Sequence, residues 1–497
     1  MRNPQNPTVG IDDLAAYIPS LYLPIATLAE ARNIEYAKLN KGLGLEAMAV
    51  PDVGEDAATM MANAVRELID RNQLDPRRIG RIYLGTESAL DGAKPTATYA
   101  LQMLTDYYAP HYGPDAFLHC DVVDLTFACI GAVDAMQNSL DWLRTNPEEL
   151  AIVVAADNAK YELASTGEYT QGAGAVAVLL SAQPRLLAVD SKWGVATRPV
   201  YDFYKPLRRV DKADLIKEVL QLANRNHVDV PALVADLRTR LSHEGVVASN
   251  EETLYLHKET PVFDGPYSNA CYQQRIREAL DHYQAQHEDF SGATQWDKLI
   301  FHLPYAYQAR RMFGEIFWRE QVRGPQAELL REQCGQAPPR KEDFEDQAAF
   351  EQAQMGFWRM VSKTPLYREF VAQRIAPGER ASSLVGNIYT GSIFLSLMST
   401  LENASDLAPG QQFGFFAYGS GSKSKVFTAT LCSGWAERVA RFGLMERLQK
   451  RQAIDYPTYE ALHRGIQREP VGKSAHIFRT QTLDAAGVRS YTCGDLV

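Results

Sequence analysis

The most reactive side chain in this sequence is a cysteine between a predicted strand and a predicted helix. Cys129 ends the apolar run VDLTFA (123–128), and a helical pattern, VDAMQNSLDWLRTN (133–146), follows closely. A thiol in the first turn of a helix lies at the positive end of the helix dipole, where free N–H groups stabilise a thiolate or an oxyanion. Such a site favours nucleophilic acyl chemistry, whereas most free cysteines are small buried core residues. Local context alone leaves the two interpretations evenly balanced.

A carboxylate and an imidazole follow other predicted strands. Glu87, in LGTESALD (84–91), comes directly after an apolar strand and is placed for proton transfer. The structural alternative is a helix start capped by Thr86. His302, in FHLPY (301–305), ends an apolar strand before a proline and would point into any cavity there, although a purely structural histidine is the commoner outcome. Each signal is weak when taken alone.

Glycines in AYGSGSKS (417–424) permit either a plain hairpin turn or a close approach of backbone to a ligand. The sequence has no HExxH, no CxxC pair and no GxxxxGK[ST], so it predicts neither a metal site nor a phosphate loop. Its six scattered cysteines favour reduced thiols in a cytoplasm.

Composition narrows the class of protein. The chain has 497 residues, 46% of them apolar and 23% charged, which predicts a sizeable core in two lobes or one duplicated unit. A net charge of −10 disfavours a nucleic-acid surface. We see neither a secretory signal at the N-terminus nor an apolar run of the roughly 18–20 residues that a membrane span needs. We therefore expect a cytoplasmic protein without a membrane or nucleic-acid partner.

Alternating strands and helices must position these residues. The pattern predicts strands within 78–88, 149–161 and 172–190, the last broken near Pro184, and helices at 55–72 and 133–146. The second half repeats the theme in 297–318, 382–404 and 411–431. Such alternation indicates an α/β architecture, and a duplicated core is a hypothesis. Two polar stretches, 207–260 and 320–352, are interpreted as solvated helical insertions.

Short motifs in a fixed order connect these pieces to a known family. GTESALD, FAC, VVAADNAKY, TQGAGAVAVLL, YDFYKP, FDGPYSNACY, FHLPY, GNIYTGSIFLSL and AYGSGS follow one another along the chain. This series resembles the 3-hydroxy-3-methylglutaryl-CoA synthase family of thiolase-like condensing enzymes. The resemblance implies a five-layered αβαβα fold of two related halves, usually dimeric. Residues 1–200 would form the half with Glu87 and Cys129, and residues 201–497 the half with His302.

The resemblance also implies roles for these residues in an acyltransferase reaction. Cys129 would take an acetyl group from a thioester, Glu87 would act as general base, and His302 would bind and polarise an acetoacetyl thioester. Backbone at Cys129 and Ser420 would form the oxyanion hole, and no metal, nicotinamide or flavin is needed. The residues implied to line the pocket are Asp91, Asp157, Asp202, Phe203, Asn387, Tyr389, Tyr418 and Ser420.

Some positions depart from the family pattern. Ile130 follows the cysteine where a tyrosine is usual, and Asp134 stands in a segment that is normally small and neutral. Tyr307 occupies the place of a lysine near the coenzyme A path, and Arg310 and Arg311 are candidates to replace that lysine. The 207–260 insertion follows YDFYKP, near the family's pantetheine entrance.

Three functions remain open from the sequence. The first is a free-standing synthase that makes hydroxymethylglutaryl-CoA for the mevalonate route. The second is a relative that acts on chains bound to an acyl carrier protein, as in β-branching of polyketides, for which Lys205, Arg208 and Arg209 could meet an acidic carrier. The third is a non-catalytic thioester-binding scaffold, which Cys129 and Glu87, retained together with His302, disfavour.

Overall fold

The computed structural model describes residues 7–240, 252–257, 259–472, 478–484 and 487–493. The chain divides into a main unit, residues 1–202 with 265–497, and a second unit, Phe203–Asp264. The two sequence halves therefore share the main unit, and the predicted division near residue 200 into related halves stays a prediction.

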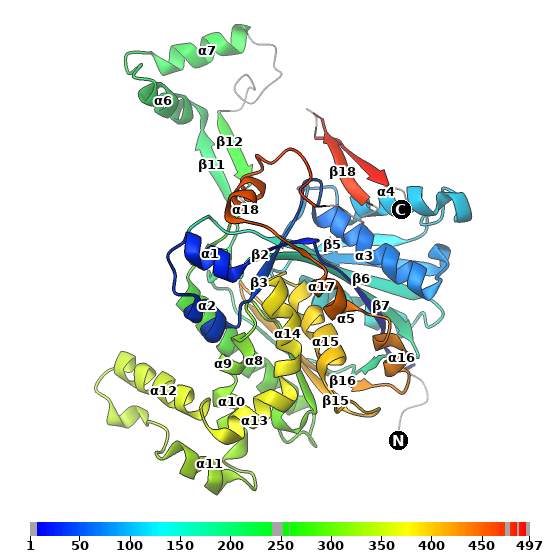
Figure 1. The fold of residues 1–497 in the computed structure, drawn as a ribbon, viewed down its shortest axis with the longest axis vertical. Coiled ribbons are helices and arrows are strands. Elements are labelled where there is room, and N and C mark those ends of the chain that lie inside the picture. The colour runs from blue at the N-terminus through cyan, green and yellow to red at the C-terminus, as the bar shows by residue number, and fades with distance from the viewer. Residues whose placement is uncertain (1–6, 241–251, 258, 473–477, 485–486, 494–497) are drawn as a thin grey trace. The chain divides into compact units, whose positions relative to one another are not determined.

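A ten-stranded mixed sheet forms the centre of the main unit (Figure 1). Its order is β14-β15-β16-β8-β1-β7-β6-β4-β5, and β9 pairs with β16. The β4, β5 and β6 strands run parallel, as do β14 and β15, while β1 and β6 pair antiparallel with β7. The strand bounds are β1 Val9–Tyr17, β4 Ile79–Gly85, β5 Asp121–Leu125, β6 Leu150–Ala159, β7 Gly172–Ala182, β8 Leu187–Val189, β9 Gly194–Thr197, β14 Lys298–Phe301, β15 Gln412–Gly419 and β16 Lys423–Leu431.

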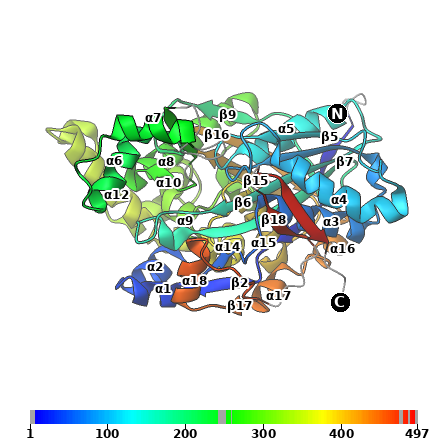
Figure 2. The same ribbon diagram turned by 90° about the horizontal axis from the view of Figure 1, so that it is seen from above.

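Helices form layers between and outside the two halves of this sheet. One buried cluster joins α5 and α15 to β1, β6 and β7 on one side and to β15 and β16 on the other, so these two helices form the middle layer. A second cluster packs α3 and α4 on the outer face of the first half (Figure 2), and a third packs α8, α10, α12 and α13 outside the second half. These five layers confirm the predicted αβαβα fold. The bounds are α3 Ala57–Asn72, α4 Thr96–Tyr112, α5 Gly131–Leu143, α8 Gly265–Gln286, α10 Gly314–Gln321, α12 Gln347–Val361, α13 Pro365–Arg374 and α15 Gly391–Asn403.

A smaller group of elements covers one edge of the main unit. The α1 and α2 helices, which connect the antiparallel strands β2 and β3, pack with these strands and with α18 in a fourth apolar cluster (Figures 1 and 2). The remaining bounds in the main unit are β2 Leu21–Pro24, α1 Ile25–Ala31, α2 Tyr36–Leu43, β3 Ala47–Val50, α9 Gln308–Met312, α11 Ala327–Cys334, α14 Ala376–Val385, α16 Trp435–Val439, α17 Leu444–Gln449, β17 Gln452–Ala453, α18 Tyr456–His463, β18 Phe478–Leu483 and β19 Arg489–Cys493.

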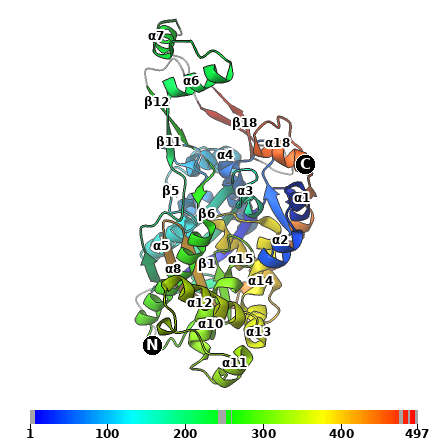
Figure 3. The same cartoon turned by 90° about the vertical axis from the view of Figure 1, so that its left-hand side faces the viewer.

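The second unit is built on two short strand pairs. β10 (Phe203–Tyr204) pairs with β13 (Val262–Phe263), and β11 (Leu207–Asp211) pairs with β12 (Thr253–His257). Beyond β11 the chain forms α6 (Lys212–Leu222) and α7 (Val230–Arg240), which lie together in Figure 3. The two helical runs predicted in this insertion are confirmed, except for residues 241–251, which lie outside the described residues.

Most predicted elements appear within a few residues of their predicted positions. The predicted helices at 55–72 and 133–146 are α3 and α5, and the strands within 149–161 and 172–190 are β6, β7 and β8. The α3 helix begins at a capping box, in which Asp56 accepts the Thr59 N–H and the Thr59 hydroxyl contacts the Asp56 N–H. The predicted 320–352 insertion contributes α11 and the start of α12 to the main unit.

Close backbone contact brings the end of β4 against the start of α5. A side chain at Gly85 would place its Cβ 2.1 Å from the Ala132 nitrogen, and one at Gly131 would meet the Leu125 carbonyl oxygen at 2.7 Å. Only glycine permits this approach. The contact fixes the distance between the loop after β4, which carries Glu87, and the turn before α5, which carries Cys129.

The Gly85→Ala variant is expected to lose about 1–3 kcal/mol of unfolding free energy or more, because its Cβ overlaps the backbone of α5. Chemical denaturation of both proteins measures this difference. Gly92→Ala is the matched control, since nothing lies within 4 Å of its added Cβ. Equal denaturation midpoints for the two variants would contradict the proposed packing constraint.

Candidate active site

Cys129 lies in a tight turn between β5 and α5. The preceding residue, Ala128, has a φ of 38°, in the left-handed region that non-glycine residues seldom adopt. The helix begins at Gly131, so the thiol precedes α5. The position in the first turn of the helix that the sequence predicted is therefore wrong. The cysteine is 8% exposed. A strained turn at a buried thiol is typical of a functional site.

The Glu87 carboxylate is a hydrogen-bond partner of this thiol. Cys129 Sγ lies 3.1 Å from Glu87 Oε1, although the two residues belong to different loops. A carboxylate at this distance can accept the thiol proton or act on a group attached to sulfur. The structure therefore brings two of the three predicted catalytic residues together.

Asp157, near the end of β6, holds the loop that carries Glu87. Its Oδ1 accepts hydrogen bonds from the Glu87 N–H at 2.7 Å, from Thr86 Oγ1 at 2.9 Å and from Ser88 Oγ at 3.0 Å. The Asp157 side chain is fully buried, so these bonds offset its desolvation. The next helix of the chain begins only at Thr96, so the alternative in which Thr86 caps a helix is wrong.

His302, which follows β14, is almost fully buried and hydrogen-bonded. Its Nδ1 lies 2.6 Å from Ser392 Oγ, and the Tyr272 hydroxyl donates to its carbonyl oxygen at 2.9 Å. Burial lowers the pKa of the imidazole from 6.5 to about 3, so the ring is neutral near pH 7. The Ser392 hydroxyl also lies 2.9 Å from the Tyr389 carbonyl oxygen. The His302 ring is also hydrogen-bonded to the Tyr389 backbone, so Ser392 and Tyr389 together set which ring nitrogen is protonated.

The turn between α14 and α15 supplies two of the predicted pocket residues. Tyr389 has a φ of 46°, and its N–H donates to Asn387 Oδ1 at 2.8 Å. Burial raises the pKa of the Tyr389 phenol well above 10, and the acidic groups Tyr161, Glu87 and Cys129 raise it further. Thr390, the next residue of the turn, accepts the Ala132 N–H at Oγ1 over 3.0 Å, so this turn lies against the start of α5, three residues after Cys129.

Asp202 holds the glycine-rich turn after β15. The Tyr418 hydroxyl donates to Asp202 Oδ2 at 2.6 Å, and the Gly421 N–H donates to Oδ1 at 2.8 Å. Before that turn, a Cβ on Gly419 would lie 2.8 Å from the Phe127 carbonyl oxygen. The backbone around Ser420 is thus packed against the Cys129 turn, and AYGSGSKS is more than a plain hairpin.

Two predicted pocket residues, Asp91 and Phe203, have described contacts within their own segments. Asp91 is exposed and accepts hydrogen bonds from the N–H groups of Ala93 and Lys94, at 2.7 and 2.8 Å, within its own loop. Those bonds hold the pKa of its carboxyl below the ordinary value. Phe203 belongs to the second unit, where its ring centroid lies 6.4 Å from that of Phe263. The pocket roles of both residues stay predictions.

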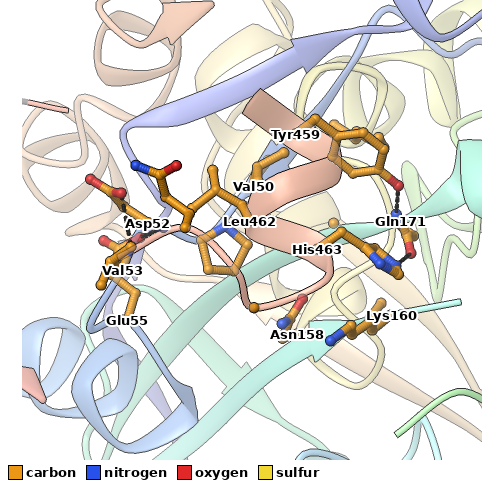
Figure 4. A pocket seen from close by; sticks show the side chains of 17 residues that line it. Val50, Asp52, Val53, Glu55, Asn158, Lys160, Gln171, Tyr459, Leu462 and His463 are labelled. Atoms are coloured by element: carbon orange, nitrogen blue, oxygen red, sulfur yellow. Dashed lines mark hydrogen bonds between the residues drawn. The ribbon is translucent and has the colours of Figure 1, made fainter. Parts of the chain in front are cut away.

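Tyr161 is a site residue that sequence reasoning missed. Burial raises the pKa of its phenol, and the acidic groups Cys129 and Glu87 raise it further. Its N–H donates to Gln171 Oε1 at 2.7 Å, and its carbonyl oxygen lies 2.8 Å from His463 Nε2. Figure 4 shows Gln171 and His463 with Tyr459 beside a cavity of about 250 Å³. Only the motif VVAADNAKY, which ends at Tyr161, could have indicated this residue.

Ser392 was missed as well, because nothing in the sequence links it to His302.

The described residues contain no group of three or more His, Cys, Asp or Glu side chains that could hold a metal ion. Within the same residues, no helix is both long and apolar enough to cross a membrane.

The imidazole of His302 is expected to stay neutral from pH 8 down to about pH 5. The unfolded chain takes up its proton near 6.5 and the folded chain only near 3, so the free energy of unfolding should fall as the pH drops through this window. NMR of protein labelled with ¹⁵N-histidine measures the protonation, and His302→Gln assigns the signal by its loss. An assigned signal that titrates above pH 6 would contradict the burial argument.

Comparisons with known proteins fit this geometry. A family model described as hydroxymethylglutaryl-coenzyme A synthase N terminal matches residues 3–184, and the C-terminal model matches residues 255–479. The hydroxymethylglutaryl-CoA synthase of Haloferax volcanii is 30% identical over 466 residues, which cover 92% of this chain and 91% of that protein. The Enterococcus faecalis synthase is 29% identical over 457 residues, with 92% and 91% coverage.

Solved structures give the same result. MvaS in complex with 3-hydroxy-3-methylglutaryl coenzyme A aligns over 98% of this chain and 100% of its own, with a TM-score of 0.73 and 26% identity. The curacin-pathway HMG synthase in complex with acetyl donor-ACP covers 98% and 100%, with a TM-score of 0.72, and at 21% identity it supports the fold alone. The motif resemblance is confirmed, and the chain belongs to the hydroxymethylglutaryl-CoA synthase family.

Proposed function

We propose that this protein is an acyltransferase of the hydroxymethylglutaryl-CoA synthase type. It condenses an acetyl thioester with acetoacetyl-CoA through an acetyl-S-cysteine intermediate and then hydrolyses that thioester. The observation that carries this proposal is the 3.1 Å contact of Cys129 Sγ with Glu87 Oε1 in a strained, buried turn.

The first half-reaction loads the enzyme. The Cys129 thiolate attacks the acetyl carbonyl, and the coenzyme leaves as a thiol that takes up the cysteine proton. Backbone N–H groups at Cys129 and Ser420 stabilise the oxyanion, since the two turns lie against each other. Glu87 then removes a proton from the acetyl methyl group, a weakly acidic position that requires a placed base.

The second half-reaction forms the new carbon–carbon bond. The carbanion attacks the β-carbonyl of the acceptor, and the resulting alkoxide takes up the proton that Glu87 removed, which restores the Glu87 carboxylate. A neutral His302 polarises that carbonyl when the Ser392 hydroxyl donates to Nδ1, because Nε2 then bears the hydrogen. Water finally cleaves the enzyme thioester and restores the Cys129 thiol.

A cationic groove in the main unit supports the proposal that the substrate is attached to a carrier with several negative charges. It has a volume of about 770 Å³ and includes Arg311 of α9, the helix that follows FHLPY. Five of its cations form no ion pair with a described carboxylate, and a nucleotide carrying phosphates fits this charge. These cations are Lys41, Arg311, Arg359, Lys363 and Arg368.

Arg310 is a poor replacement for the family lysine. It forms a short ion pair with the buried Glu379, and its guanidinium carbon lies 3.9 Å from the Tyr307 ring centroid. Among the candidates that the sequence suggested, Arg311 therefore remains.

The missing lysine favours a second candidate function, in which an acyl carrier protein delivers the substrate, as in β-branching.

We also propose a cytoplasmic homodimer that serves the mevalonate route. β5 ends the strand order, and its outer edge has no described partner strand, so it can pair with a second copy.

Purified protein mixed with acetyl-CoA is expected to gain the mass of one acetyl group, and Cys129→Ala is expected to gain none. Intact-chain mass spectrometry measures the gain, and a parallel reaction with acetyl-loaded carrier protein shows which donor is faster. If neither donor acetylates the protein, the scaffold function is supported instead.

Glu87→Gln is expected to keep acetyl loading but to lose about 10²–10⁴-fold in condensation rate, because an amide cannot remove the methyl proton. Product formation and exchange of the acetyl methyl hydrogens with deuterated water measure the two steps separately. Normal exchange in this variant would assign the base to another group.

Ser392→Ala is expected to lower kcat/KM for condensation about tenfold or more, because His302 Nδ1 loses its partner and its tautomer is no longer set. Ser396→Ala is the control, since Ser396 is buried one turn later on α15 and makes no described contact with His302. A similar small effect in both variants would remove Ser392 from the mechanism.

A further inference from the structure

The unusual Asp134 of α5 is paired with two lysines of β16. Asp134 Oδ2 lies 2.5 Å from Lys423 Nζ, and Oδ1 lies 2.7 Å from Lys425 Nζ. All three side chains are at most 15% exposed. Charges that are this well shielded from water interact more strongly than surface ion pairs. The negative charge of the Asp134 carboxylate is therefore balanced by the two lysines.

Lys423 has a second contact, with the turn that carries Cys129. Its Nζ lies 3.9 Å from the centroid of the Phe127 ring, within the range of a cation–π interaction. Phe127 precedes Cys129 by two positions, and Lys423 begins β16 directly after the turn that contains Ser420. One ammonium group thus joins three segments: the Cys129 turn, the start of α5 and the end of the Ser420 turn.

Lys425 makes no such contact. It pairs with the other oxygen of Asp134, lies 2.5 Å from Gln137 Oε1 and stands over the Trp193 ring at 5.6 Å. It therefore removes negative charge from the same carboxylate without touching either turn. The two lysines share a strand, a partner and a charge, and differ in the contact with Phe127.

The joined turns supply the two halves of the oxyanion hole. An oxyanion hole works only when its donors are held close to the position of the developing charge. Gly419 gives the two turns their close approach, but a glycine has no side chain with which to fix their relative position. An ion pair combined with a cation–π contact supplies that restraint.

We propose that Lys423 is a positioning residue, which holds the Ser420 turn against the Cys129 turn through its contacts with Asp134 and Phe127. These two contacts of Lys423 are called the clip. This inference rests on the proposed function, because the backbone donors that it aligns are those of the acyl-transfer site. In this clip Asp134 anchors the lysine.

The test compares kinetic constants for acetyl transfer and condensation. Lys423→Met is expected to lower kcat about 10- to 100-fold while KM changes less than about threefold, because the donors move relative to the transition state. Lys423→Arg is expected to recover kcat to within about threefold, since arginine keeps both the ion pair and the cation–π contact. Lys425→Met, the matched control, removes the same charge and is expected to lose less than about threefold. An unchanged kcat in Lys423→Met, equal losses in both lysine variants, or no recovery with arginine would each overturn the proposal.

A second readout does not depend on the proposed reaction. The rate at which iodoacetamide alkylates Cys129, followed on its own peptide by mass spectrometry, is expected to fall about threefold or more in Lys423→Met, because a nearby positive charge that favours the thiolate is lost. If the wild-type chain is not acetylated but this rate falls in Lys423→Met and not in Lys425→Met, the proposed function fails and the clip stands. If acetylation proceeds and neither kcat nor the alkylation rate changes, the clip fails alone.

Phe127→Leu covers the case in which Lys423→Met does not fold. It keeps the ion pair and removes only the aromatic ring, so a partial loss of about threefold to tenfold in kcat is expected. A wild-type kcat in folded Phe127→Leu would overturn the proposal.

Discussion

Close backbone packing around Cys129 is the constraint on which the rest of the site depends. Gly85 and Gly131 let the end of β4 and the start of α5 touch, and Gly419 lets the turn after β15 reach the same place. Each added Cβ would overlap neighbouring backbone, so the three positions leave no room for a side chain. The middle helix layer and both halves of the sheet converge here, and residues far apart in sequence share one small volume.

Hydrogen bonds to buried carboxylates and hydroxyls then fix the positions of the loops, which close packing alone does not determine. Asp157 binds the backbone of Glu87, Asp202 binds Tyr418 and the N–H of Gly421, and Ser392 binds His302. Buried polar groups of this kind cost free energy unless they are hydrogen-bonded. Their satisfied bonds also hold each functional loop in one position.

Charge is balanced locally around the nucleophile. The Glu87 carboxyl contacts the thiol, while Asp134 with its two lysines adds a net positive charge beside Phe127 of the Cys129 turn. Burial keeps His302 neutral, so it adds no charge near pH 7. This balance suits a reaction in which a thiolate, a carbanion and an alkoxide must form in turn.

The sequence by itself determined the alternation of strands and helices and the family, because hydrophobic periodicity and short motifs are local properties of the chain. It also singled out Cys129, Glu87 and His302 as candidate catalytic residues. It misplaced Cys129 by part of a helical turn and took Thr86 for a possible helix cap, since the ends of elements depend on what packs against them. Only the tertiary structure paired Cys129 with Glu87, Ser392 with His302, and Asp134 with Lys423. Those contacts join segments that meet only when α5 and α15 are enclosed between the two halves of the sheet, so no local pattern could reveal them.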